Sequence, residues 1–507
     1  MKESLPLGSI VSVVGAGAMG AGIAQVAAQA GHPVRIYDMR EGAAVKAIEG
    51  ISAQLQSRVE KGKLTSEEHS AILGRIGAAE TLQALADSSL IIEAIVEQRQ
   101  AKQALFSELE ALCPATTVLA SNTSSISITA LAASMKYPAR VIGLHFFNPA
   151  PLMALVEVVS GLATDTKLID CMVATVTAWG KTPVVCRSTP GFIVNRVARP
   201  FYAESMRLLQ EGASDCATLD ALLREAGSFR MGAFELTDLI GHDVNYAVTR
   251  SVFDAFYGDF RFQPSLIQHE LVEAGFFGRK SGRGFYDYSS TVEKPQPRQL
   301  VAVGSPLTCI AEGDLGPAKS LLIRFRQAGI SIVERPGEGV LRVGSAVLAL
   351  SDGRLASQRA RDHHFSNLAL FDLAHDYSTV TSLGVAFSAS TPDEAKQAVV
   401  DLLVGAGIKV RPLADVPGLV VLRTVVMLAN EAADTLLQQV ANARDIDLAM
   451  CAGVNYPSGQ LAWADRLGAE WVVNVLKCLQ SVYGEDRYRP SMLLSRIATE
   501  GALFHAD

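Results

Sequence analysis

One histidine of this chain lies in a setting suited to catalysis. His145 stands in the apolar stretch Gly-Leu-His-Phe-Phe-Asn-Pro at 143–149, and the single carboxylate Glu157 follows it. Upstream, Ser124 belongs to the hydroxyl-rich cluster Ser-Asn-Thr-Ser-Ser at 121–125. A lone histidine among apolar residues is usually a satisfied core group. A base with a carboxylate to orient it and a hydroxyl donor nearby is, however, the set of groups that acid–base catalysis needs.

A dinucleotide-binding fingerprint opens the chain. The apolar run 9–14 precedes Gly-Ala-Gly-Ala-Met-Gly, after which small residues predict a helix and 34–37 a second strand. In this pattern the first glycine makes the turn, the second lets a pyrophosphate approach backbone N–H groups, and the third lets helix and strand pack closely. The predicted cofactor site therefore includes Gly15, Gly17, Ala18, Met19 and Gly20.

The residue at the end of the second predicted strand favours NAD over NADP. Asp38 can accept hydrogen bonds from both ribose hydroxyls and would repel a 2′-phosphate. Arg40 is the one residue nearby that argues the other way. Fingerprint and histidine together indicate the oxidation of an alcohol by NAD, with neutral His145 accepting the proton.

The composition is that of an ordinary globular protein. The 507 residues indicate about three or four domains. A formal net charge of −7 argues against general nucleic-acid binding. No stretch approaches the roughly 18 uninterrupted apolar residues of a spanning helix, and the first residues lack a secretory apolar region.

The cysteines and histidines give no sign of a metal site. The seven cysteines form no Cys-x-x-Cys pair, which fits a reducing compartment. The pair His363-His364 has no neighbours at metal-ligand spacing. We therefore expect a cytoplasmic protein that binds no metal, no nucleic acid and no membrane.

The first part of the chain alternates between strands and helices. A charged helical hairpin is expected between Glu41 and Gly74 and a helix from about Gln98 to Leu112. Further strands are expected at 89–92, 117–120, 141–144 and 156–159. This order predicts a mostly parallel sheet whose ligands bind at the carboxyl ends of the strands. From Thr189 the pattern becomes helical, and the polar, proline-rich segment 289–298 predicts a linker.

Six motifs, in this order, closely resemble the 3-hydroxyacyl-CoA dehydrogenase family: GAGAMG, SNTSS, GLHFFNP, LVEVV, TPGFIVNR and GRGFYDY. The resemblance covers Ile10 to about Tyr288. It implies an α/β Rossmann-like NAD domain followed by an all-α domain. It also implies that L-3-hydroxyacyl-CoA is oxidised to 3-oxoacyl-CoA in the cleft between these domains.

The resemblance also implies roles for single residues. His145 would be the base, Glu157 its partner, and Ser124 and Asn195 polar contacts to the substrate. The positions that bind NAD in the family fall on Gly15, Gly17, Gly20, Asp38, Glu97, Lys102 and Asn148. Lys61 and Lys63 match a basic hairpin that meets CoA, although composition alone favours a solvated hairpin there.

An internal repeat fills the rest of the chain. The motif TPGFIVNR at 189–196 recurs as VPGLVVLR at 416–423, a shift of 227 residues. The repeat predicts four segments: an NAD-binding Rossmann-like domain at 1–188, a helical domain at 189–294, a degenerate Rossmann-like domain at 295–412 and a second helical domain at 413–507.

The second half is expected to have lost the chemistry. Residues 307–334 resemble a degenerate copy of the opening strand–helix–strand unit. In this copy Gly313, Leu315 and Ala318 take the positions of the three fingerprint glycines, and a leucine at the second position would block the approach of the pyrophosphate. The same shift places Asp372 opposite His145, Gly384 opposite Glu157 and Leu422 opposite Asn195. We expect a structural second half that packs as a partner subunit would.

The acyl chain of the substrate is less well determined. The duplicated form resembles long bacterial family members that act on 3-hydroxyadipyl-CoA in phenylacetate catabolism, and others that act on 3-hydroxybutyryl-CoA. The carboxylate of an adipyl chain needs a cation or several donors, and Arg199 and Arg230 are candidates by residue type. An arginine in a helical domain is, however, more often an ordinary surface or inter-helix residue than a ligand of the substrate.

Three other interpretations are open. A dehydrogenase of free 3-hydroxyacids would rely on a catalytic lysine, which the order of the motifs argues against. A non-enzymatic NAD- or acyl-CoA-binding relative would not need the pair His145–Glu157. A fatty-acid oxidation multienzyme would need a hydratase domain, for which the chain has no room. A homodimer or a pseudo-dimeric monomer is expected.

Overall fold

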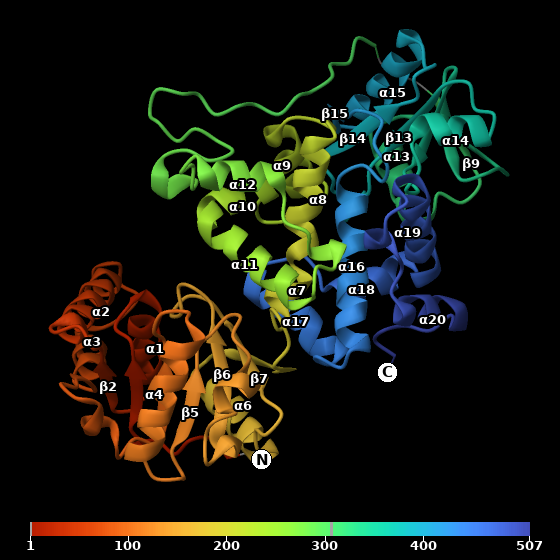
Figure 1. Ribbon diagram of the computed structural model, residues 1–507. Helices are drawn as coiled ribbons and strands as arrows, with labels where there is room; N and C mark the ends of the chain where they lie inside the picture. Colours follow the sequence, from red (N-terminus) through yellow and green to blue (C-terminus); the bar gives the residue numbers. More distant parts are fainter. Residues whose placement is uncertain (1–2, 305–307, 507) are drawn as a thin grey trace. The chain divides into compact units, whose positions relative to one another are not determined.

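The computed structural model describes residues 3–304 and 308–506 and divides them into two compact units (Figure 1). The first unit runs to Arg196 and also contains Gln438–Val454. The second contains Val197–Leu437 and the chain from Asn455 onward. The expected fold class is confirmed. A Rossmann-like sheet domain, a helical domain, a second sheet domain and a second helical domain are all present.

The first sheet is mostly parallel, as predicted. Its strands are β1 (Val11–Val14), β2 (Val34–Tyr37), β3 (Ile76–Ala78), β4 (Leu90–Glu93), β5 (Val118–Ser121), β6 (Val141–Phe146), β7 (Leu155–Ser160) and β8 (Thr182–Arg187). Their order is β3-β2-β1-β4-β5-β6-β7-β8, and only the pair β6–β7 is antiparallel. The central strands are runs of buried apolar residues, which is typical of a sheet covered on both faces. The predicted strands occur with small shifts at their ends.

The helices of the first unit cover both faces of this sheet. They are α1 (Ala18–Gln29), α2 (Ala43–Glu60), α3 (Ser66–Leu73), α4 (Arg99–Leu112), α5 (Ile128–Ala132), α6 (Thr166–Ala178) and α7 (Val194–Val197), which ends beyond the unit. One core cluster joins α1 and α6 to strand residues that include Leu144 and Val158. Because side chains alternate along a strand, His145 and Glu157 point to the opposite face.

A distant segment closes the outer edge of β8. This segment, Gln438–Val454, contains α17 (Ala443–Val454). The backbone N–H of Arg187 donates to the carbonyl of Val440 at 2.8 Å, and that of Val185 donates to the Asp445 carboxylate at 3.2 Å. An open strand edge exposes such groups to unwanted pairing, so these contacts protect the sheet. The sequence had placed this segment with the second helical domain alone, because no local pattern reports the contact.

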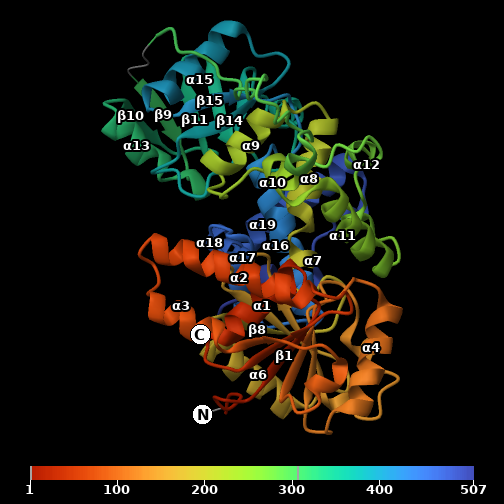
Figure 2. The same cartoon turned by 90° about the vertical axis from the view of Figure 1, so that its left-hand side faces the viewer.

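The second sheet is more irregular. Its strands are β9 (Thr308–Glu312), β10 (Ser331–Arg335), β11 (Val340–Val343), β12 (Ala346–Leu350), β13 (Leu368–Phe371), β14 (Ser382–Phe387) and β15 (Lys409–Pro412), in the order β10-β9-β11-β12-β13-β14-β15 (Figure 2). Its helices are α13 (Leu321–Gln327), α14 (Ala356–Asp362) and α15 (Asp393–Gly405). The predicted strand–helix–strand unit is present as β9, α13 and β10, although Leu307 lies outside the described residues. The next strand, β11, runs antiparallel to β9.

The helical part of the second unit contains both copies of the repeat. The first copy supplies α8 (Arg199–Gln210), α9 (Cys216–Glu225), α10 (Ala233–Ile240), α11 (His242–Ala255) and α12 (Leu266–Glu273). The second supplies α16 (Val421–Leu437), α18 (Gln460–Leu467), α19 (Ala469–Tyr483) and α20 (Met492–Glu500). Within the described ranges, no helix is both long enough and apolar enough to cross a bilayer.

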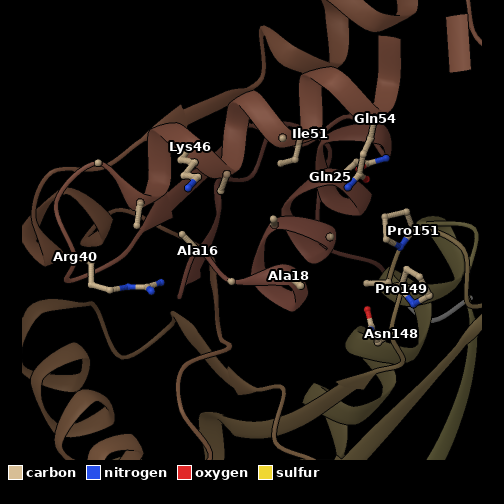
Figure 3. A pocket seen from close by; sticks show the side chains of 18 of the residues that line it. Ala16, Ala18, Gln25, Arg40, Lys46, Ile51, Gln54, Asn148, Pro149 and Pro151 are labelled. Carbon is tan, nitrogen blue, oxygen red and sulfur yellow. The ribbon is translucent and has the colours of Figure 1, made fainter. Parts of the chain in front are cut away.

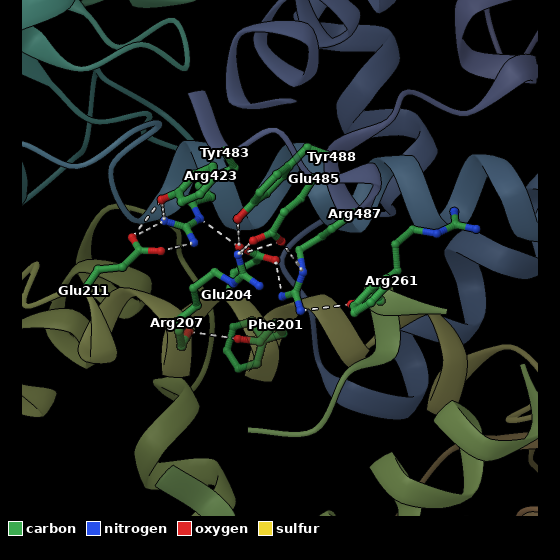
Figure 4. Close-up of polar contacts among 12 residues, drawn as sticks. Phe201, Glu204, Arg207, Glu211, Arg261, Arg423, Tyr483, Glu485, Arg487 and Tyr488 are labelled. Atoms are coloured by element: carbon green, nitrogen blue, oxygen red, sulfur yellow. Dashed lines mark hydrogen bonds and ion pairs between the residues drawn. The ribbon is translucent and has the colours of Figure 1, made fainter. Parts of the chain in front are cut away.

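A buried ionic network joins the two copies where α8 packs against α16 (Figure 4). The fully buried Arg423 donates to Glu204 and Glu211, each at 2.8 Å. Glu204 also accepts from Arg487 at 3.3 Å and from the Tyr488 hydroxyl at 2.9 Å. Removing one member of such a network would leave a buried charge without compensation, so the network fixes the packing of α8 on α16.

Candidate active site

The predicted base and its carboxylate are paired directly across two strands. His145 of β6 and Glu157 of β7 are opposite each other in the antiparallel register. Nδ1 of His145 lies 2.6 Å from Oε2 of Glu157, and both side chains are buried. A carboxylate can only accept from a neutral imidazole, so Nδ1 carries the proton and Nε2 is left with its lone pair. This geometry leaves Nε2 as the atom that can take a proton.

Glu157 also anchors the turn that carries Asn195. Its second oxygen, Oε1, accepts from the backbone N–H groups of Ile193 and Val194, each at 3.0 Å. The turn reaches this position through Gly191 and Phe192, which both have positive φ. The Phe192 ring lies 5.9 Å from that of His145. One buried carboxylate therefore fixes both the imidazole and the start of the segment with Asn195.

The hydroxyl cluster after β5 is organised by Glu97. Its Oε1 accepts from the Thr123 hydroxyl at 2.6 Å and from the Ser124 backbone N–H at 3.0 Å. The hydroxyls of Ser124 and Ser125 lie 3.3 and 3.0 Å from the same oxygen. Since β5 and β6 are parallel neighbours, this loop leaves the sheet at the same edge as His145.

Lys102 holds two carboxylates behind that loop. Its side chain is 1% exposed, with Nζ 2.5 Å from Oε1 of Glu93 and 3.2 Å from Oε2 of Glu97. Burial would raise the pKa of Glu97, but Lys102 and the Thr123 hydroxyl outweigh burial and lower it. Glu97 thus stays ionised. The buried ammonium group of Lys102 thus positions the loop through Glu97. The predicted contact of Lys102 with NAD stays a prediction.

The glycine fingerprint forms a cradle that fits a dinucleotide. Gly15 has φ +107°, and a Cβ on Gly20 would lie 1.8 Å from the Gly15 carbonyl oxygen, so both positions require glycine. A Cβ on Gly17 would meet no described atom within 4 Å, and Gly17 opens onto a cavity of about 830 Å³ (Figure 3). The first N–H groups of α1 are available there for phosphate oxygens.

Two predicted fingerprint residues differ in what they offer a ligand. Ala18 lines the cavity, as do Asn148 and the following Pro149. Met19 packs its side chain against the hydrophobic core, so only its backbone N–H, in the first turn of α1, is available to a ligand. The cradle is therefore made of backbone groups and small side chains.

Asp38 is tied to the fingerprint loop. Its Oδ2 accepts from the Ala16 backbone N–H at 2.8 Å, and its Oδ1 lies 3.0 Å from Nε of Arg40. The Arg40 guanidinium, together with hydrogen bonds from the backbone, lowers the pKa of Asp38 to about 2. The carboxylate is therefore ionised at neutral pH, as an acceptor for ribose hydroxyls must be.

The predicted CoA lysines and the two candidate arginines differ in exposure. Lys61 and Lys63 lie exposed in the turn between α2 and α3, and neither forms an ion pair with a described residue. Arg230 is also exposed. Arg199, in contrast, is buried, donates to the Thr249 hydroxyl at 2.9 Å and lies over the Tyr202 ring.

Sequence reasoning missed part of the framework around the histidine. Oδ1 of Asn122 accepts the Phe146 backbone N–H at 2.8 Å, next to His145. The Ser121 hydroxyl donates to Glu93 at 2.6 Å. Asn122 stands inside the cluster that the sequence singled out, so its position in that motif was the available signal. Glu93, at the end of a predicted strand, gave a weaker one.

Among the described residues, no group of three or more His, Cys, Asp or Glu side chains is placed to hold a metal ion. In the same residues, all seven cysteines are free thiols.

Family models match most of the chain. The 3-hydroxyacyl-CoA dehydrogenase NAD binding domain matches residues 10–189, and the C-terminal domain of that dehydrogenase matches twice, at 191–288 and 418–506. The 3-hydroxybutyryl-CoA dehydrogenase reduced Rossmann-fold domain matches residues 348–417. These matches confirm the duplicated helical domain and the degenerate sheet domain between the copies.

Individual proteins match at two lengths. The 3-hydroxyadipyl-CoA dehydrogenase of Escherichia coli (strain K12) is 46% identical over 96% of this chain and 97% of its own. The probable 3-hydroxybutyryl-CoA dehydrogenase of Bacillus subtilis is 41% identical over 55% of this chain and 96% of its own. A crystal structure described as 3-hydroxybutyryl-CoA dehydrogenase from Escherichia coli K12 has a TM-score of 0.90 and 44% identity, and the match covers 98% of this chain and 99% of that one.

Proposed function

Because the chain belongs to the 3-hydroxyacyl-CoA dehydrogenase family, whose members are NAD-dependent oxidoreductases, we propose that it oxidises 3-hydroxyadipyl-CoA with His145 as the base. The observation that carries this proposal is the buried pair in which Nδ1 of His145 lies 2.6 Å from Glu157. It leaves one imidazole nitrogen ready to accept the proton of a C3 hydroxyl.

The residues divide the work of the reaction. Bound NAD would accept the hydride from C3 of the substrate. His145 takes the hydroxyl proton at Nε2, because loss of a hydride from an alcohol requires loss of the proton as well. Glu157 stabilises the imidazolium that forms and keeps the ring in the correct tautomer. Ser124 and Asn195 orient the hydroxyl and the thioester carbonyl, so that the C3 hydrogen faces the nicotinamide.

Coenzyme and CoA are assigned to separate parts of the first unit. Gly15, Gly17 and the first turn of α1 hold the pyrophosphate, and Asp38 holds the adenosine ribose. The exposed cations Lys61 and Lys63 are assigned to phosphate groups of CoA. Support for both assignments is the chemistry of these groups and, for NAD, the open cradle at Gly17.

A dicarboxylic substrate is favoured by the full-length relative, which is named 3-hydroxyadipyl-CoA dehydrogenase. Arg199 is the better candidate cation for the distal carboxylate. It follows Asn195 closely in the chain, and a guanidinium can bind a carboxylate through two N–H groups. Arg230 is exposed.

The second candidate substrate is 3-hydroxybutyryl-CoA, because a solved structure with a TM-score of 0.90 carries that name. Comparing kcat/KM for the two acyl-CoA thioesters, by NADH absorbance, decides between them. We expect a preference for hydroxyadipyl-CoA of about tenfold or more, since each charged hydrogen bond is worth about 1.5–3 kcal/mol. Arg199→Met should remove this preference and leave hydroxybutyryl-CoA turnover nearly unchanged. An equal loss on both substrates would reject Arg199 as the carboxylate ligand.

We also propose phenylacetate catabolism as the pathway, the cytoplasm as the location and a pseudo-dimeric monomer as the assembly. The pathway follows from the proposed substrate, and the location agrees with seven free thiols. The assembly is supported by the packing of α8 against α16, one helix from each copy of the repeat. Light scattering of the purified protein distinguishes this monomer from a homodimer.

A further inference from the structure

The Asp38 carboxylate has every acceptor position filled. Oδ2 accepts from the Ala16 N–H at 2.8 Å and from Nη2 of Arg40 at 3.1 Å. Oδ1 accepts from the Arg40 backbone N–H and from its Nε, each at 3.0 Å. A carboxylate offers about four lone-pair directions, so two ribose hydroxyls can bind only if the Arg40 guanidinium withdraws.

Arg40 can make that movement. Its side chain is 71% exposed, whereas that of Asp38 is 8% exposed. Exposed arginine pairs are weak because water competes for the charge. The backbone bonds to Asp38 do not depend on the guanidinium and would persist after it leaves.

A second cation lies near Arg40. Lys46, on α2, lines the same cavity, and Figure 3 shows both side chains at the end of the cavity beside Ala16, away from Asn148. The acidic groups near this end are Asp38 and Glu41, which also lines the cavity. An arginine fork and a lysine together are the groups that proteins use for phosphate monoesters.

We propose that Arg40 determines coenzyme specificity jointly with Asp38. The Asp38 carboxylate holds the Arg40 guanidinium, which, once released, binds the 2′-phosphate of NADP with the help of Lys46. Preference for NAD then depends on one carboxylate acting against two cations. The proposal concerns the adenosine end of the coenzyme and is independent of the acyl-CoA substrate.

The test measures binding of two nucleotide fragments, 2′,5′-ADP and 5′-AMP, by calorimetry on the full chain. The wild type should prefer 5′-AMP. Asp38→Asn retains an oxygen for the Ala16 N–H but releases Arg40, so its affinity for 2′,5′-ADP should rise about tenfold, the value of one charged hydrogen bond. Adding Arg40→Gln should abolish that gain, and adding Lys46→Met should reduce it. The ratio of kcat/KM for NADP and NAD should follow the same order.

Binding of 5′-AMP reports whether each variant keeps its adenosine site. The single variant Arg40→Gln provides an independent check, because it should weaken 2′,5′-ADP further without weakening 5′-AMP. The proposal is overturned if Asp38→Asn gains no affinity for 2′,5′-ADP, or if the gain persists when Arg40 is replaced. Since no hydroxyacyl substrate enters the binding assay, failure here leaves the proposed reaction untouched.

Discussion

The two sheet domains share a backbone register but place different chemistry on it. In the first, Gly143 of β6 pairs with Val159 of β7, and in the second Leu370 of β13 pairs with Ala386 of β14. Both pairs obey the 227-residue shift. The shift therefore holds in three dimensions through the strands that carry the dyad, and Asp372 truly occupies the place of His145.

The second domain keeps the anchoring carboxylate and lacks the histidine. Asp372 accepts backbone N–H groups of Val420, Val421 and Leu422 at 2.8–3.0 Å. Two of these groups correspond to the amides of Ile193 and Val194 that Glu157 holds. In the second domain a carboxylate therefore stands at the position of the histidine, where it holds the backbone turn.

The space for a second carboxylate is closed as well. A Cβ on Gly384, which corresponds to Glu157, would lie 2.7 Å from Leu413 Cδ1 and 3.1 Å from Leu222 Cδ1. At the other end of the sheet, a Cβ on Gly313 would lie 2.2 Å from the Gly337 carbonyl oxygen, and Leu315 is buried. Close packing, as well as residue loss, distinguishes the second domain from the first.

The largest expected effect comes from replacing the proposed base. His145→Gln should lower kcat about 10²–10⁴-fold, since it removes the proposed proton acceptor that Glu157 orients, while NAD affinity changes little. Steady-state rates and a separate NAD titration measure the two quantities. His363→Gln, an exposed histidine of the second domain, is the matched control and should be silent. Near-normal turnover of His145→Gln would show that His145 is not the base.

The second prediction concerns pH and Asp372. Burial raises the pKa of Asp372 to about 6, above the 3.8 of a solvated aspartate, although four backbone N–H groups favour the ionised form. The folded state therefore binds the proton more tightly. The stability that this proton contributes should be lost as pH rises from about 4 to about 6, a change on the order of 3 kcal/mol.

Asp372→Asn should remove that part of the pH dependence and leave kcat unchanged. Denaturant titrations of wild type and variant at several pH values measure it. Identical slopes for the two proteins would show that Asp372 does not titrate in this range.

The third prediction separates the two carboxylates by their function. Glu157→Gln keeps an oxygen for the amides of Ile193 and Val194, but its amide group would donate to Nδ1 and move the imidazole proton to Nε2. We expect kcat to fall about 10²-fold because the wrong tautomer cannot accept a proton. Asp372→Asn is the matched control in the second domain. Equal kcat values for these two variants would contradict the division of roles.

The smallest expected effect concerns the closed sheet edges. The N–H of Arg187 donates to Val440, and at the equivalent position the N–H of Ala414 donates to Ala213, so each edge receives a segment from the other copy of the repeat. Asp445→Ala removes the acceptor of the Val185 N–H and should destabilise the first unit by about 1 kcal/mol. Hydrogen exchange at the β8 amides measures this loss. Unchanged protection of Val185 would contradict a structural role for this segment.

Local sequence determined much of this molecule. The turn at Gly15 and the close approach at Gly20 follow from the absence of a Cβ, and alternation along β6 and β7 sends His145 and Glu157 to one face. The 227-residue repeat revealed the fate of the dyad in the second half, because the strands that carry it have no insertions between copies. Such features depend on spacing along the chain, and spacing is visible in the sequence.

Tertiary structure alone decided the partners. Nothing local shows that Glu157 holds the turn before Asn195, that Asp38 accepts the Ala16 N–H, or that Val440 closes the edge of β8. Each is a polar group satisfied across the fold. A buried donor or acceptor must find a partner, but which partner it finds depends on how distant segments pack, and that is fixed only when the chain has folded.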